Sequence, residues 1–155
     1  MTQEKKQSFT RRISQANAST LVVITYEIAL ENLKDAMEAE TDSAAFGKAL
    51  TKVKECVMSL QSALNFEYPI SGNLLSLYSY VIREVTRAQA GRTKEPLDSV
   101  RNVLKSLNTA FAEVAALDHS EALMENTQNV YAGMTYGRTD VIESTDVEAN
   151  RGFFA

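Results

Sequence analysis

The sequence contains one cysteine, one histidine, two prolines, and no long apolar run. Because Cys56 has no second cysteine to pair with, an internal disulfide is excluded, which is typical of proteins from reducing compartments. The N-terminal residues MTQEKKQSF lack the apolar stretch of a signal peptide. No segment approaches the roughly 18 apolar residues that span a bilayer. We therefore expect a cytosolic protein without membrane insertion.

Positive charge is also scarce, since the formal net charge is −4 and the pI is near 5.1. Binding to nucleic acid depends largely on clustered Lys and Arg, so no nucleic-acid partner is expected. The basic residues near the N-terminus (Lys5, Lys6, Arg11 and Arg12) are predicted to lie on a solvated arm. A chain of 155 residues fits one domain that can bury a core without metal or disulfides.

Residues for catalysis or metal binding are missing. The di-metal sites of helical bundles use Glu-x-x-His pairs, but Ala116 stands where the partner of His119 would need a glutamate. No Cys-x-x-Cys pair, phosphate-binding glycine loop or Gly-x-Ser-x-Gly turn occurs. We expect no cofactor, no metal and no enzyme activity, with Cys56 as a buried thiol. A phosphate-accepting role for His119 remains an alternative, although an ordinary surface histidine near a helix end is favoured.

With only two prolines and six glycines, the chain shows apolar residues at helical spacing throughout, which predicts an all-α fold. Four helices are expected: one from Asn17 to about Ala39, one from residue 42 or 43 to before Pro69, one from about Gly72 to Ala90, and one with Pro96 in its first turn. Ser71 or Asn73 is predicted to cap the third helix, and Gly91 to end it in a left-handed conformation.

Short connections between helices of similar length favour an antiparallel up-down-up-down four-helix bundle. The predicted divisions are an N-terminal arm (1–16), a helical bundle domain (17–122) and an irregular C-terminal tail (123–155). The tail has isolated aromatic residues, which we expect to fold back onto apolar surface, to contact a partner, or to be disordered; they are Tyr131, Tyr136, Phe153 and Phe154.

The first predicted helix is more apolar than a helix that packs on one side only. At 100° per residue, its charged side chains fall in one narrow strip that contains Glu27, Glu31, Lys34 and Glu38. Soluble monomers rarely leave large apolar patches uncovered. Three explanations remain open: several neighbouring helices, a cover formed by the arm through Phe9 and Ile13, or a groove for a partner's helix.

Two segments resemble the flagellar secretion chaperone family. SQANASTLVVITYEIALENLKDA resembles the family's first helix through Leu21, Tyr26, Glu27, Ala29 and Leu30. ISGNLLSLYSYVIREVTRAQ is similar to its Asn-Leu-x-x-Leu-Tyr-Asp-Tyr-Ile-x-Arg-Arg-Leu-x-x-Ala-Asn segment, with matches at Asn73, Leu74, Leu77, Tyr78, Tyr80, Arg83 and Ala88. The resemblance covers roughly residues 9 to 117. Departures include Ala18 in place of a turn proline, Thr25 in place of leucine and Ile28 in place of glycine.

This resemblance implies an export chaperone in the bacterial cytosol that binds the C-terminal segment of flagellin and prevents its premature polymerisation. The export gate and flagellar regulators are possible further partners. The residues expected to supply groove or core surface are Leu21, Ile24, Tyr26, Leu30, Leu77, Tyr78 and Val81. Phe9 and Ile13 are expected to form a lid that competes with the guest. The alternatives are a histidine phosphotransfer domain acting through His119 and a generic helical-bundle adaptor.

Overall fold

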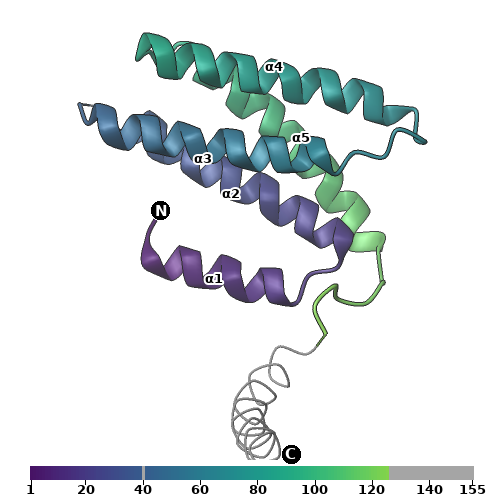
Figure 1. Ribbon diagram of the computed structural model, residues 1–155. Coiled ribbons are helices and arrows are strands. Elements are labelled where there is room, and N and C mark those ends of the chain that lie inside the picture. Colours follow the sequence, from purple (N-terminus) through teal and green to yellow (C-terminus); the bar gives the residue numbers. More distant parts are fainter. Residues whose placement is uncertain (40, 126–155) are drawn as a thin grey trace, which may run out of the picture.

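The computed structural model describes residues 1–39 and 41–125 of the chain (Figure 1). Within these ranges it contains five helices and no strand, which confirms the all-α prediction. The helices are α1 (Gln3–Ser14), α2 (Ala18–Glu38), α3 (Ser43–Ser62), α4 (Ile70–Gly91) and α5 (Leu97–Leu117). The aromatic residues of the predicted tail lie outside the described residues. The division into arm, domain and tail stays a prediction.

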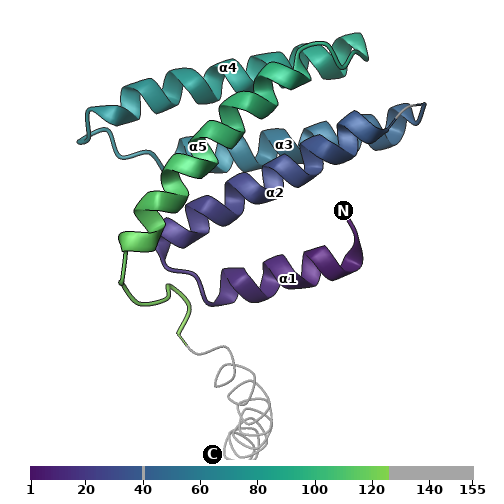
Figure 2. The same cartoon turned by 180° about the vertical axis from the view of Figure 1, so that it is seen from behind.

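Helix α2 is the central helix of the molecule. It begins after Asn17, whose side chain accepts a hydrogen bond from the Thr20 amide at 2.9 Å and so caps the first turn. It packs against α3 and α5, and α1 lies along its outer side (Figures 1 and 2). The apolar surface of this helix is therefore covered in part within the chain, by neighbouring helices and by the N-terminal segment together.

Helices α3 and α4 pack against each other and supply much of the core. Asp42 caps α3 by accepting hydrogen bonds from the amides of Ala44 and Ala45. The predicted cap of α4 is wrong, because this helix begins at Ile70, directly after Pro69, and has no side-chain cap. Ser71 is instead buried inside the first turn, where its hydroxyl donates to the Asn65 carbonyl.

The predicted left-handed residue at the end of α4 is displaced by one position. Gly91 is the last helical residue, and Arg92 adopts the left-handed conformation with φ of 49°. The amides of Arg92 and Thr93 both bond to the Ala88 carbonyl, which closes the helix end despite the side chain at the left-handed position. Pro96 lies immediately before α5 rather than inside its first turn.

Only the first half of α5 is inserted in the core. Leu97, Val100 and Leu104 are fully buried, whereas the later members of the same apolar stripe are half-buried or exposed. Figure 2 shows α5 crossing the other helices obliquely, from the end of α4 towards the start of α2. Because α5 crosses its neighbours obliquely, its burial stops about halfway along the helix.

The predicted arm contains a helix that the sequence reasoning did not identify. Thr2 accepts a hydrogen bond from the Lys5 amide and caps α1, and good helix formers such as Gln, Glu, Lys and Arg fill much of its length. No residue of α1 is buried, and the helix packs chiefly on α2. It is an addition to the four longer helices rather than part of their core.

Candidate partner-binding surface

The structure divides the seven predicted partner-binding residues between core and surface. Four are buried in the core: Ile24, Tyr26, Tyr78 and Val81. Leu21 and Leu30 on α2 are half-buried, and Leu77 on α4 is 37% exposed. Three of the seven are thus accessible to a partner in this conformation, and partner binding by any of them stays a prediction.

Aromatic side chains from three helices form a cluster in the core, next to the accessible apolar residues. The hydroxyl groups of Tyr26 and Tyr78 hydrogen-bond to each other, and their ring centroids are 6.4 Å apart. Phe111 of α5 lies against Tyr26 at a centroid distance of 5.5 Å. Burial raises the pKa of both phenols, so the cluster is neutral and apolar at physiological pH. It fixes α2, α4 and α5 at one point.

Above this cluster, α5 carries apolar side chains that leave the core step by step. We call Leu107, Phe111, Val114 and Leu117 the α5 stripe. The first two are half-buried, whereas Val114 is 55% exposed and Leu117 is 80% exposed. Their spacing of four, three and three residues places them along one side of the helix. An apolar helical surface that continues from the core into solvent fits an amphipathic guest helix.

A second exposed apolar group lies in the connection between α3 and α4 and at the first residue of α4. Phe66, Tyr68 and Ile70 are all largely exposed there, around Pro69. Sequence reasoning interpreted this segment only as a helix break. The available signal was the unusual density of large apolar residues in a turn, where polar residues normally prevail.

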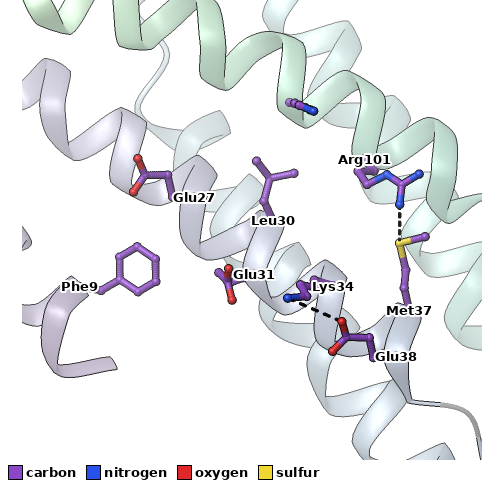
Figure 3. A pocket seen from close by; sticks show the side chains of 9 residues that line it. Phe9, Glu27, Leu30, Glu31, Lys34, Met37, Glu38 and Arg101 are labelled. Carbon is purple, nitrogen blue, oxygen red and sulfur yellow. Dashed lines mark hydrogen bonds and ion pairs between the residues drawn. The ribbon is translucent and has the colours of Figure 1, made fainter. Parts of the chain in front are cut away.

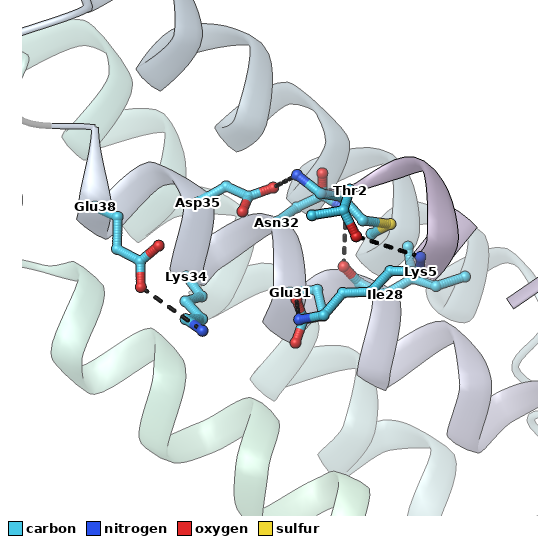
Figure 4. A network of polar contacts seen from close by, with 9 residues as sticks. Thr2, Lys5, Ile28, Glu31, Asn32, Lys34, Asp35 and Glu38 are labelled. Carbon is cyan, nitrogen blue, oxygen red and sulfur yellow. Dashed lines mark hydrogen bonds and ion pairs between the residues drawn. The ribbon is translucent and has the colours of Figure 1, made fainter. Parts of the chain in front are cut away.

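Two residues of the charged strip of α2, Glu27 and Glu31, pair with α1, whereas Lys34 and Glu38 pair with each other and remain exposed. Arg12 pairs with Glu27, and the Met1 amino group pairs with Asp35. Lys5 pairs with Glu31 at 2.5 Å (Figure 4). The hydrogen bond to Glu27 raises the pKa of Arg12, so this guanidinium stays protonated. Glu27 and Glu31 are therefore the residues of the strip on which a basic helix docks.

Two hollows flank α1. A cleft of about 700 Å³, which we call the α1–α5 cleft, has Phe9, Leu30 and Met37 as its apolar lining and charged residues around them (Figure 3). On the other side of α1, a groove of about 560 Å³ lies towards α3 and is called here the α1–α3 groove. Phe9 borders both hollows, and Ile13 borders the second. The predicted lid residues thus lie over half-covered apolar surface of α2.

The end of α5 is joined to the start of α2 by polar contacts. The side-chain amide of Asn17 donates to the backbone carbonyls of Asp118 and Ser120 at 3.2 Å each, and the Ser19 hydroxyl donates to the Asp118 carboxylate. The Leu123 amide bonds to the Ala16 carbonyl at 2.9 Å. Hydrogen bonds from Ser120 and Ser19 lower the pKa of Asp118 to about 2. We call these contacts the terminal joint.

Groups that carry chemistry are not assembled into a site in the described part of the chain. His119 is exposed beyond the end of α5, with Asp118 next to it rather than a cluster of basic residues. Cys56 is half-buried rather than fully buried as predicted, and its burial raises the pKa of the thiol, which disfavours the thiolate form. Among residues 1–39 and 41–125, no group of His, Cys, Asp and Glu could hold a metal ion.

The apolar clefts and exposed apolar side chains of this all-helical chain are surface features that helical protein-binding domains use to contact their partners. The family model of the flagellar protein FliS matches residues 1–131, and the chain belongs to this family. A flagellar secretion chaperone FliS from Vibrio cholerae is 26% identical over 121 residues, which cover 75% of this chain and 88% of that protein. The helices described for this chain include none long and apolar enough to cross a bilayer.

Proposed function

We propose that the protein is a non-enzymatic export chaperone of the bacterial cytosol that binds the C-terminal segment of flagellin. It prevents premature polymerisation of that segment and keeps it competent for flagellar type III secretion. The observation that carries this proposal is the α5 stripe, an apolar helical surface left exposed in a member of a secretion chaperone family. The export gate and flagellar regulators are its proposed further partners.

The stripe suits a guest that folds on binding. Ordering such a segment costs about 2–5 kcal/mol, which must be offset by burying a large apolar area. Val114 and Leu117 offer exposed apolar surface, and Phe111 connects that surface to the Tyr26 ring of the core. A helix bound here would therefore rest on a rigid base.

The scaffold that we propose is an antiparallel four-helix bundle of α2 to α5. Contacts between opposite ends of paired helices support it. Tyr26, early in α2, contacts Phe111, late in α5, and Arg101, early in α5, contacts Met37, late in α2. Gln89, late in α4, donates to the Gly47 carbonyl, early in α3, at 2.9 Å.

In this proposal α1 is a removable lid. It is attached to α2 by ion pairs and by the half-buried side chains of Phe9 and Ile13. Exposed ion pairs contribute about 0.2–1 kcal/mol each, so a guest with a large apolar surface can displace the helix. Its removal would uncover more of Leu30 and the apolar lining of the α1–α5 cleft.

The test is complex formation between the purified chain and a C-terminal flagellin fragment, followed by size-exclusion chromatography. We expect a complex with the unmodified chain and little or none with the double variant Val114→Asp, Leu117→Asp. Both positions are exposed, so the variant should keep its fold, which circular dichroism checks.

Ala112→Asp, Ala116→Asp is the matched control because it adds two carboxylates at exposed positions of α5 away from the stripe. This variant should bind as well as the unmodified chain. Absence of any complex would contradict the proposed function. Equal binding by the stripe variant and the control would contradict the assignment of the site.

A further inference from the structure

The α1–α3 groove combines an apolar lining with a basic rim. Its apolar lining includes Phe9 and Ile13 from α1, Ile28 from α2, and Ala45 and Ala49 from α3. Its basic residues are Lys6 of α1 and Lys48 and Lys52 of α3. Such a lining fits a peptide that carries both carboxylates and apolar side chains.

The charge around the groove is not cancelled by its own acidic residues. Asp35 pairs with the Met1 amino group, and Lys52 pairs with Glu55 at 2.6 Å. In residues 1–39 and 41–125, no carboxylate is within ion-pair distance of Lys6 or Lys48. Two lysines on opposite walls of the groove are therefore available to an acidic ligand.

The C-terminal part of the same chain contains such a ligand. Residues 140–148 read DVIESTDVE, with four carboxylates, three β-branched apolar residues and no basic residue. We propose that residues 140–148 dock in the α1–α3 groove, with their carboxylates near Lys6 and Lys48 and their apolar side chains against Phe9, Ile13 and Ile28.

The terminal joint places the chain where it can reach this groove. The bond between the Leu123 amide and the Ala16 carbonyl holds the chain beside the connection between α1 and α2. From Leu123 to Asp140 the chain can extend ~56 Å at ~3.3 Å per residue, which exceeds the ~18 Å length of the 12-residue α1. Attachment in the same chain also gives the segment a millimolar effective concentration.

Docking of this segment supports α1 from a second side. The ion pairs with α2 hold one side of α1, and the acidic segment joins its other side to α3 through Phe9, Ile13 and Lys6. The tail thereby raises the free energy needed to lift α1. This inference concerns contacts within one chain and does not depend on flagellin.

The first experiment is hydrogen exchange on the full chain without any partner. The variant Asp140→Asn, Glu143→Gln, Asp146→Asn, Glu148→Gln keeps the shape of the segment and removes its charge. We expect the α1 amides to exchange several-fold faster in this variant, with α3 amides unchanged. The control Glu121→Gln, Glu125→Gln removes carboxylates outside the segment and should leave α1 exchange unaltered. Equal exchange of α1 in the acidic-segment variant and the unmodified chain would overturn the proposal.

The second experiment is carbodiimide cross-linking of the unmodified full chain, which joins a carboxylate to a nearby lysine amine as an amide with loss of water. Mass spectrometry of the monomer should find residues 140–148 linked to Lys6 and Lys48. Lys94 and Lys105 do not line this groove and serve as internal controls. Equal links to all four lysines, or links found only between two copies of the chain, would count against docking within one chain.

Discussion

The hydroxyl groups of Tyr26 and Tyr78 hydrogen-bond to each other inside the core, so each buried hydroxyl depends on the other for its hydrogen bond. In Tyr26→Phe, the Tyr78 hydroxyl remains buried without that bond, so we expect the free energy of unfolding to fall by about 1–2 kcal/mol. In Tyr26→Phe, Tyr78→Phe neither hydroxyl is left unpaired, so the loss should be smaller than the sum of the two single losses. Urea unfolding measures all three variants, and strictly additive losses would contradict the pairing.

The same pair predicts a dependence of stability on alkaline pH. Burial raises the pKa of both phenols in the folded state, whereas unfolded phenols ionise near pH 10. Below that pH both states keep their protons, and the pair adds no pH dependence. Above it, the unfolded state releases protons that the folded state retains, so the free energy of unfolding falls as pH rises. The double phenylalanine variant should show a shallower fall between pH 9 and 11.

At the scale of elements, α1 differs from the other four helices in how it is held. The larger helices bury apolar stripes, whereas α1 buries no residue completely and relies on ion pairs with the strip on α2. Segments with few buried contacts open at a lower free energy than the core. Helix α1 is thus the element that can move without disturbing the aromatic cluster.

This difference predicts that deleting residues 1–15 raises the affinity for the C-terminal flagellin fragment, because the guest no longer has to displace α1. Calorimetric titration compares the truncated and full chains. The milder variant Lys5→Gln, Arg12→Gln removes two ion pairs and should give an intermediate rise. Unchanged or weaker binding by the truncated chain would reject the lid.

Helix boundaries were predictable where a local side chain sets them. The starts of α2 at Asn17 and of α3 at Asp42–Ser43 could be predicted from the sequence, because a capping side chain bonds to an amide no more than three residues away. The end of α4 was missed by one residue. Buried Ala88 and the bond from Gln89 to α3 hold the last turn in place through tertiary contacts that a sequence pattern does not reveal.

Helix α1 and the exposed half of α5 escaped prediction for related reasons. Phe9 and Ile13 make too short a stripe to indicate a packed helix, and the ion pairs that position α1 join residues far apart in sequence. Along α5, Leu104 and Val114 look alike in the sequence. The angle at which α5 crosses its neighbours decides that one is buried and the other exposed, and this angle is a tertiary property.

For the whole molecule, the exposed apolar residues pose the question of self-association. A chaperone that keeps this surface for a guest should be a monomer of 17.1 kDa when alone, whereas an adaptor closed by self-association should be a dimer. Light scattering at micromolar concentration distinguishes the two. A dimer that Val114→Asp dissociates would favour the adaptor.

A phosphotransfer role makes a different prediction at this scale, because all activity would then depend on His119. The exposure of this residue beyond the end of α5 leads us to expect that His119→Ala binds the flagellin fragment with unchanged affinity. Incubation with acetyl phosphate followed by mass spectrometry should leave the mass of the unmodified chain unchanged. A gain of one phosphoryl group at His119 would reopen the enzymatic alternative.

The terminal joint also bears on how the protein is made. Asn17 can cap α2 as soon as Thr20 is available, but the carbonyl groups that its amide binds lie about a hundred residues further along the chain. During synthesis the nascent helices can pair in order, while this closing contact must wait until α5 has emerged from the ribosome. A prematurely terminated product that lacks residues 118–123 would leave the side-chain amide of Asn17 without these acceptors. Truncated translation products therefore differ from the finished protein in the unpaired Asn17 side chain at the start of α2.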